Sequence, residues 1–434
     1  MTRYFSLFAL ALTAVAAASA QAPRVLRSQF AVYDTREDAL AGRSDKTARR
    51  ITVAPQDAAG DGSVFTQTFD ADVAWGDCNT YLHLENVGSA YTLLINGRTA
   101  AEVEDDLSPA DFMISDFMVQ GRNTLAIVPR VSRTPRIQNS GKRSAQPRFA
   151  ESCIFAQRKM HIDDFAVRIV PDTTGKFARL FLDIAVVNNF NGPETVSVGY
   201  DITSPAGKLL DYTVREVTLD GRSRDTIRIT TPIYDAAKYA WGDNKGDAPL
   251  YSLMLYIKRN GRLEEYIPLK AAYGQTEFAD GRVVRLDREL TFMPHRYAAA
   301  ADRLTTRKEI AALKREGINT LHTDFPQPAW FYDECDRAGV YVFDRAAINA
   351  VEERENRAVG GTPSNDPAMA EEYIGRTDAM YYRVRNHPSV AGFLLGGETG
   401  NGYAMYKAYQ HLKSVEELRP VICEDARGEW NSDL

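Results

Sequence analysis

The stretch from Arg385 to Gly402 constrains the fold of this 434-residue chain more than any other part of the sequence. Its apolar run from Val390 to Leu395 predicts a strand that is buried on both faces, as strands of parallel sheets are. Glu398 comes where this run ends, and a Gly-rich turn leads into a helical pattern from Tyr403 to Leu412. Barrels of alternating strands and helices carry their chemistry at the carboxyl ends of the strands, so Glu398 is a candidate catalytic residue.

The chain from residue 273 onward alternates short apolar runs with amphipathic helical patterns, which predicts βαβ units and a parallel sheet. The expected strands are 283–292, 319–323, 340–343, 390–395 and 420–423, and the expected helices are 306–316, 328–338, 367–385 and 402–415. A closed barrel of this type has eight strands. We therefore predict a partial (β/α) TIM-type barrel over residues 273–434, about the first half of one.

The preceding part of the chain carries β patterns with little helical periodicity. In residues 21–157, the run Tyr81–Val87 alternates in polarity, and the run Tyr91–Ile95 ends in an Asn-Gly turn, so we predict a β-sandwich. In residues 158–272, strand patterns at 161–170, 178–188, 195–203 and 250–258 have the spacing of an immunoglobulin-like sandwich. The chain is thus expected to be a multidomain protein.

The first twenty residues have the pattern of a secretory signal peptide. Arg3 gives a positive start, residues 5–18 are apolar or small, and Ala18-Ser-Ala20 matches a small-x-small cleavage site. This stretch is shorter than the roughly 20 apolar residues that span a membrane. We expect removal of residues 1–20, export to a periplasmic or extracellular location, and no membrane span.

Charge and cysteine usage narrow the classes of partner and cofactor. A net charge of −6 and the lack of a basic block argue against a nucleic-acid partner. None of the four cysteines has metal-ligand spacing, and neither a phosphate loop nor a Ser-His-Asp order is found, so neither a metal nor a cofactor is expected. Cys78 and Cys153 are either a disulfide or two buried thiols, and Cys335 and Cys423 are expected to be buried thiols. His83 lies in an alternating strand, and we expect it at the surface.

Several motifs carry a resemblance to a known family. "RNHPS", an apolar strand and "GGE" at residues 385–398 resemble the acid/base motif of glycoside hydrolase family 2, the β-galactosidase and β-glucuronidase group. "LHLENVGSAYTLLINGR" is similar to the jelly-roll sugar-binding domain that opens family members, and "RKMHIDDFAVRIVPD" to the entry of their middle domain. "GINTLHTDFPQPAWFYDECDRAGVYVFD" resembles the second and third barrel strands. The resemblance implies retaining hydrolysis of β-glycosidic bonds in a carbohydrate substrate, with Glu398 as general acid/base.

The chain also departs from the family pattern. Asp324-Phe325-Pro326 stands where family members have "SHYP", and residues 344–351 stand where they have "DEANIETHG". Gly397 replaces an Asn that bonds the sugar 2-hydroxyl and so stabilises the transition state. The family nucleophile belongs to a later strand. Glu424, Asp425 and Glu429 follow the fifth strand, but no family motif assigns them that role. These departures predict a degenerate and incomplete active site.

Candidate binding residues and functions follow from these positions. His322 and Asp324 end the second barrel strand and can bind a sugar hydroxyl, and Trp330 can stack on a sugar or pack in a helix. Glu398 is either a general acid or a carboxylate with a structural role, in which it stabilises its turn or pairs with a nearby arginine. His387 precedes a proline and is expected to be structural.

Three hypotheses remain open at the level of the whole chain. The chain is an exported glycoside hydrolase, a non-catalytic carbohydrate-binding or assembly scaffold, or a truncated product of a longer gene. An open barrel exposes sheet edges, so a homo-oligomer or a protein partner is expected to cover them.

Overall fold

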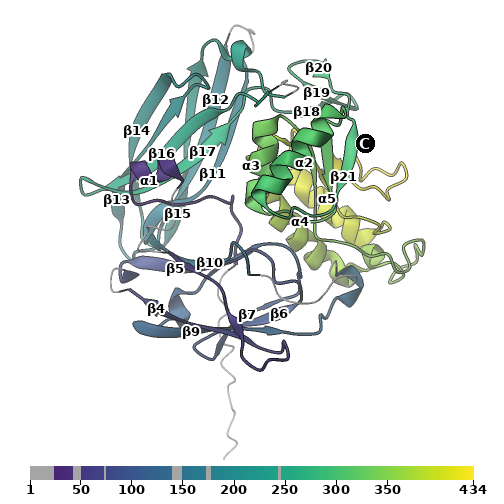
Figure 1. Cartoon of the computed structure of the whole chain (residues 1–434), viewed down its shortest axis with the longest axis horizontal. Helices are drawn as coiled ribbons and strands as arrows, with labels where there is room; N and C mark the ends of the chain where they lie inside the picture. Colours follow the sequence, from purple (N-terminus) through teal and green to yellow (C-terminus); the bar gives the residue numbers. More distant parts are fainter. Residues whose placement is uncertain (1–23, 43–49, 73–74, 139–148, 173–176, 243–245) are drawn as a thin grey trace, which may run out of the picture.

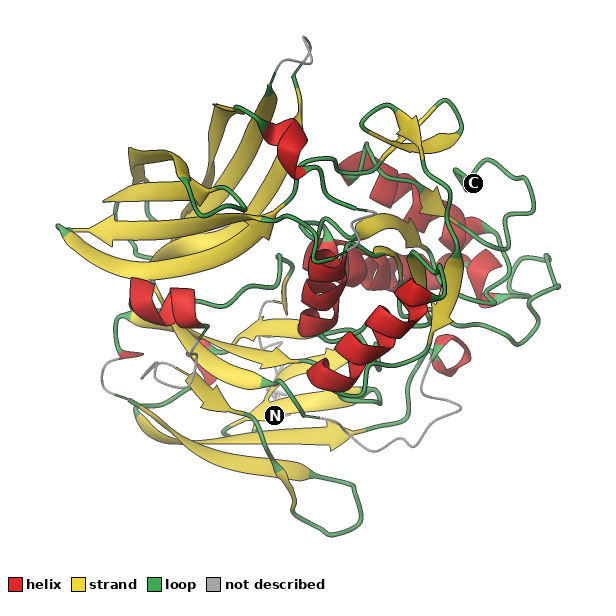
Figure 2. Cartoon of the chain, turned by 45° about the horizontal axis from the view of Figure 1, so that its top comes forward, coloured by secondary structure: helices red, strands yellow, loops and turns green. Residues whose placement is uncertain are grey.

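The computed structural model describes residues 24–42, 50–72, 75–138, 149–172, 177–242 and 246–434. Three β-rich regions lie around a central junction in Figure 1, and most of the helices gather around the third of them in Figure 2. The predicted signal peptide at residues 1–20 lies outside the described ranges. Among the described residues, none of the helices has the length and hydropathy of a membrane-crossing segment.

Two five-stranded sheets, at the bottom of Figure 1, form the first sheet pair, with the orders β1-β8-β5-β10-β2 and β3-β4-β9-β6-β7. Their strands are β1 (Arg24–Val25), β2 (Arg50–Thr52), β3 (Gln56–Asp57), β4 (Phe65–Ala71), β5 (Cys78–Leu84), β6 (Tyr91–Ile95), β7 (Arg98–Val103), β8 (Ala110–Met113), β9 (Gly121–Pro129) and β10 (Cys153–Arg158). Alternate side chains of both sheets, such as Leu82, Ile154, Leu93 and Ile127, meet in one buried core. The strand patterns predicted around residues 81–95 are confirmed, with β5 beginning three residues earlier.

The second sheet pair joins a three-stranded sheet, β11-β12-β15, to a four-stranded sheet, β14-β13-β16-β17. Its strands are β11 (Met160–Pro171), β12 (Ala178–Asn188), β13 (Glu194–Thr203), β14 (Leu209–Leu219), β15 (Ser223–Ile233), β16 (Tyr251–Arg259) and β17 (Arg262–Ala271). Leu180, Leu182, Tyr200 and Leu255 are fully buried in the core that the two sheets share. The four predicted strands are confirmed. The prediction missed β14, β15 and β17, and β14 exposes most of its side chains, which hides its β pattern.

The third region is a five-stranded sheet with the order β21-β22-β23-β24-β25, and its neighbouring strands run parallel. Its elements are β21 (Pro294–Tyr297), α2 (Arg303–Arg315), β22 (Thr320–Thr323), α3 (Ala329–Ala338), β23 (Tyr341–Arg345), α4 (Ala370–Val384), β24 (Val390–Leu394), α5 (Tyr403–Val415) and β25 (Val421–Ile422). The predicted βαβ order is therefore confirmed.

The first strand of this region was predicted wrongly at 283–292. Residues there form a small antiparallel sheet of β18 (Glu277–Ala279), β19 (Arg282–Arg285) and β20 (Arg288–Glu289). Leu286 and Asp287 both adopt positive φ values, 49° and 61°, and turn the chain back on itself. The apolar run therefore pairs locally, and the parallel sheet begins at β21.

The central strands β23 and β24 of the parallel sheet are buried at every position, which explains their apolar sequences. On one face, Leu321, Val342 and Phe393 pack against α2 to α5. On the other face, Tyr341 and Phe343 pack against Trp241 and Phe292, which precede the sheet in the chain. We call these layers the helix-side core and the inner-face core.

The turn between α4 and β24 joins the parallel sheet to the second sheet pair. Arg385 Nη2 donates to Asp164 Oδ2 at 2.6 Å, and Asn386 Nδ2 donates to Phe165 O at 2.9 Å. Asn386 Nδ2 also donates to Ser28 Oγ at 2.7 Å. The start of the "RNHPS" motif thus has a structural role between regions.

The structure decides one open alternative in the first sheet pair and corrects one expectation. Cys78 and Cys153 are both buried and are not joined to each other by a disulfide. They lie on paired strands, but Cys78 is opposite Arg158 and Cys153 is opposite His83, so about five residues, or roughly 16 Å, separate them along the strands. His83 is also not a surface residue, because its side chain is 13% exposed and sits between the carboxylates of Asp111 and Glu85.

Candidate functional site

The carboxyl ends of the five parallel strands bring together ionisable side chains that are far apart in the sequence. We call this end of the sheet the mouth. The residues at it are Arg296 on β21, His322 and Asp324 at the end of β22, Arg345 on β23, Glu398 after β24 and Glu424 after β25. This is the end of the sheet where barrel enzymes place their chemistry. The predicted residues Glu398, His322 and Asp324 therefore lie at the same end of the sheet.

Glu398 has an unusual backbone conformation. Its φ of 51° is left-handed, which is uncommon for a residue with a Cβ and is found where the surroundings require it, often in functional sites. Its side chain is half-buried and, within the described part of the chain, makes neither a hydrogen bond nor an ion pair. A carboxyl group in this state is available to a ligand.

Two arginines stand near Glu398. A hydrogen bond to Asp324 raises the pKa of Arg296, and the charges of Glu398 and Glu424 raise it further. The hydrogen bond to Asp425 raises the pKa of Arg354, and Glu398 adds to that effect. The carboxylate of Glu398 thus stands in a cationic environment, although both guanidinium groups already have partners.

Arg345 is the most extensively bonded residue of the mouth. Its Nε donates to Thr323 O at 2.8 Å, and its Nη1 donates to Gly396 O at 2.5 Å. It also holds Glu424 in a fork, with Nη1 to Oε2 at 2.6 Å and Nη2 to Oε1 at 3.2 Å. Arg345 therefore crosses the tip of β24 and connects β23 with the loop after β25.

His322 and Asp324 occupy the second strand of the mouth. The His322 ring lies 5.0 Å from the Phe343 ring, on the inner face of the sheet. Burial lowers the pKa of His322, and the charge of Arg345 lowers it further, so the imidazole is neutral at pH 7. Asp324 is paired with Arg296. A neutral imidazole offers both a donor and an acceptor to a sugar hydroxyl.

The other predicted residues have different positions. Trp330 lies on α3, packs against the helix-side core and lines the cavity at the junction of the three regions, not the mouth. Asp425 accepts hydrogen bonds from the backbone of Thr399 and Gly400 at 2.9 and 2.7 Å, and so supports the loop that carries Glu398. Glu429 accepts from Arg357 and Tyr406, both at 2.5 Å.

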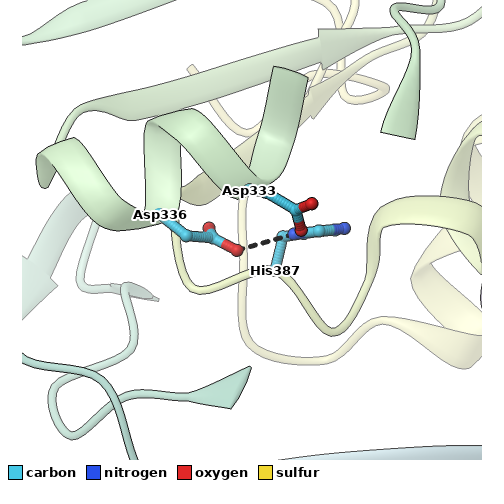
Figure 3. A group of neighbouring side chains, drawn as sticks. All are labelled: Asp333, Asp336 and His387. Carbon is cyan, nitrogen blue, oxygen red and sulfur yellow. Dashed lines mark hydrogen bonds and ion pairs between the residues drawn. The ribbon is translucent and has the colours of Figure 1, made fainter. Parts of the chain in front are cut away.

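The junction cavity measures about 890 Å³ and contains a second group of ionisable residues (Figure 3). Asp333, Asp336 and His387 offer ligand atoms within 4.8 Å of one another, the one group of this kind among the described residues. His387 Nδ1 is bonded to Asp336 Oδ2 at 2.7 Å, and Ser389 N donates to Asp336 Oδ1 at 2.9 Å. Burial lowers the pKa of His387, but Asp336 outweighs it and raises the pKa. These contacts fit the predicted structural role of His387.

Sequence reasoning missed Arg296 and Arg345 as site residues. Arg345 is the last residue of β23 and Arg296 the penultimate residue of β21, so both lie at the carboxyl ends of strands, and that position was the available signal. The contact of Arg345 with Glu424 joins residues 79 positions apart. A cross-strand contact of this kind depends on the strand order, which a linear pattern does not specify.

Comparison with known proteins gives the family context. Residues 295–433 match the family model described as "Glycosyl hydrolases family 2, TIM barrel domain". A β-galactosidase of Priestia megaterium is 25% identical over 385 residues, which are 83% of this chain and 36% of that protein. β-Galactosidase 2 of Enterobacter cloacae is 26% identical over 374 residues, with the same shares of each chain. The chain thus spans about a third of the length of these relatives.

Solved structures show the same fold. A β-glucuronidase of Bacteroides uniformis superposes with a TM-score of 0.69 at 16% identity, over 83% of this chain and 46% of that one. A family 2 member from Bacteroides cellulosilyticus superposes with a TM-score of 0.66 at 15% identity, over 93% of this chain and 57% of that one. These solved structures support the fold. Residues 295–433 match the TIM barrel domain of glycoside hydrolase family 2, and the chain is similar to β-galactosidases over 83% of its length.

Proposed function

We propose that the mouth binds a β-linked glycoside and that Glu398 donates a proton to the glycosidic oxygen. The observation that carries this proposal is Glu398 itself, an unbonded, half-buried carboxyl group that follows β24 and is the last residue of the family motif. A general acid of this kind protonates the leaving oxygen as the bond to the sugar breaks. The relatives named as β-galactosidases support a galactoside as the substrate.

The proposal includes an organisation for the whole chain. We assign residues 21–157 to a jelly-roll sugar-binding sandwich, 158–272 to an immunoglobulin-like sandwich and 273–434 to a partial barrel. Residues 1–20 would direct export to the periplasm or outside. Within the described residues, β21 and β25 are the edge strands of the parallel sheet. A second copy or another protein at these edges would protect their unpaired backbone groups.

A second candidate function is sugar binding without hydrolysis. A retaining mechanism needs a second carboxyl group about 5 to 5.5 Å from the acid. Asp324 and Glu424 are the other carboxylates named at the mouth, but Asp324 is paired with Arg296, and both oxygens of Glu424 already accept hydrogen bonds from Arg345. Gly397 also lacks the side chain that would bond a sugar 2-hydroxyl. This geometry favours a site that holds a sugar with reduced or no turnover.

The experiment is hydrolysis of a panel of aryl β-glycosides by residues 21–434, compared with Glu398→Gln and with Glu417→Gln. Glu417 is an exposed carboxylate at the other end of β25, so it is a matched control. Hydrolysis that falls about 10²- to 10⁴-fold in Glu398→Gln but persists in Glu417→Gln supports the enzyme. Binding of a glycoside by calorimetry without hydrolysis selects the second candidate, and neither binding nor hydrolysis overturns the proposal.

A further inference from the structure

We infer that Glu424, fixed by Arg345, is a substrate-binding carboxylate that selects a neutral sugar over a uronic acid. This inference rests on the proposed function and names the substrate class of the same site. It adds a residue that the family motif does not assign and gives a reason for the departures at Arg345 and Gly397.

Glu424 is held in one orientation but stays accessible. Its side chain is 41% exposed, so it is not part of a core. The fork of Arg345 bonds one lone pair on each carboxylate oxygen, at 2.6 and 3.2 Å, and fixes the carboxylate plane. Each oxygen keeps a second lone pair. A fixed, exposed carboxylate with two free acceptor sites suits two adjacent sugar hydroxyls.

The Arg345 guanidinium occupies the space above Gly397. A Cβ at residue 397 would lie 2.8 Å from Arg345 Nη1, closer than real Cβ atoms approach, and 3.3 Å from Arg345 Cζ, so the guanidinium would have to shift. The fork between Arg345 and Glu424 therefore uses the space that the missing side chain of residue 397 leaves. Arg345 and Gly397 therefore act together. The site lacks the Asn donor that family members have at position 397 and presents the oriented carboxylate of Glu424 instead.

The charges at the mouth also favour a neutral sugar. Each arginine near the mouth already has a carboxylate partner: Arg296 pairs with Asp324, Arg345 with Glu424 and Arg354 with Asp425. A uronic acid would place its own carboxylate beside Glu398 and Glu424 and would find these guanidinium groups occupied. Like charges at short range are unfavourable, whereas hydroxyl groups gain acceptors. The mouth therefore favours a neutral hexose.

The test measures binding by calorimetry in a Glu398→Gln background, which prevents turnover. The probes are p-nitrophenyl β-galactoside, β-glucoside and β-mannoside, with p-nitrophenyl β-glucuronide as the acidic sugar. Glu424→Gln is compared with the control Glu417→Gln. We expect Glu424→Gln to weaken binding of the best neutral glycoside about 10- to 100-fold and to reduce its preference over the glucuronide.

Gly397→Ala provides an independent variant. Gly397 is absent from the positive-φ glycines, so alanine fits the backbone, and its Cβ would displace the Arg345 fork. We expect a loss of affinity in the same direction, with the thermal midpoint reported alongside to exclude unfolding.

The outcomes separate this inference from the proposed function. Unchanged affinity and unchanged sugar preference in Glu424→Gln, while the background protein binds the neutral glycoside, overturn this inference alone. Tighter binding of the glucuronide than of every neutral glycoside by the background protein also overturns it. No binding of any probe by the background protein overturns the proposed function, and this inference with it.

Discussion

Glu398 combines a left-handed backbone with an unbonded carboxyl group, and both features cost stability. A residue with a Cβ in this conformation is strained by roughly 1–2 kcal/mol relative to glycine. We predict that Glu398→Gly raises the free energy of unfolding by about 0.5–1 kcal/mol, after the extra chain entropy of glycine, while it removes any hydrolysis. Chemical denaturation and the aryl glycoside assay measure the two effects. If the variant is less stable than the parent, the Glu398 side chain stabilises the turn and its role is structural.

Glu334 shows how a single buried carboxylate depends on pH. It is 1% exposed and accepts hydrogen bonds from Arg303, Arg307 and Arg337 at 2.7 to 3.0 Å. Burial raises its pKa, but these arginines outweigh burial and lower the pKa to about 2. Its stabilising effect is therefore present above pH 4.5 and is lost as the pH falls toward 2.

We predict that Glu334→Gln lowers the free energy of unfolding by on the order of 2 kcal/mol at pH 7 and by less at pH 3. Urea unfolding at both pH values measures the difference. The result that contradicts this account is an equal loss at both pH values, which would show that lost packing, and not the charge of Glu334, causes the effect.

At the scale of single residues, the sequence supported part of the site. Glu398, His322 and Asp324 could be predicted because each follows an apolar run that reads as a buried strand. Arg345 could not be assigned its role, since the role depends on the empty space above Gly397 and on a partner 79 positions away. Trp330 was predicted as a sugar contact because tryptophan often stacks on sugars. It lies on α3, however, and lines the junction cavity.

Among the elements, the inner-face core stabilises the parallel sheet by covering one of its faces. Trp241 is fully buried, packs edge-on against Tyr341 at 5.4 Å and donates from Nε1 to Asp336 O at 2.7 Å. It precedes the sheet by more than 50 residues and covers a face that would otherwise meet water. We predict that Trp241→Ala costs about 3–5 kcal/mol of unfolding free energy. Chemical denaturation measures this cost, and a Trp241→Ala variant with the same denaturant midpoint as the parent would contradict this role.

Strand and helix order could be read from the sequence, because apolar runs and amphipathic patterns alternate strongly from residue 319 onward. The apolar run at 283–292 misled the prediction. Its periodicity is that of a strand, but two residues with positive φ make it fold back as β19 and β20. Local pattern identifies a strand and does not specify its partner.

Across the whole molecule, two histidines with raised pKa values, His83 and His387, line the cavity at the junction of the regions. Burial lowers the pKa of His83, but Asp111 and Glu85 outweigh burial and raise it well above the usual value of 6.5. A raised pKa contributes stability that is full below pH 6.5 and is lost as the pH rises through the folded-state pKa. We predict that the stability difference between the parent and His83→Gln shrinks as the pH rises above 6.5. Unfolding at pH 6, 7.5 and 9 measures it, and a constant difference would show that His83 is neutral.

A crystal structure of Glu398→Gln soaked with a β-galactoside shows whether a glycoside binds at the carboxyl ends of the parallel strands. We expect sugar density at the mouth, with hydroxyl groups against Glu424 and residue 398. Density in the junction cavity beside Trp330 and His387, with an empty mouth, would contradict it.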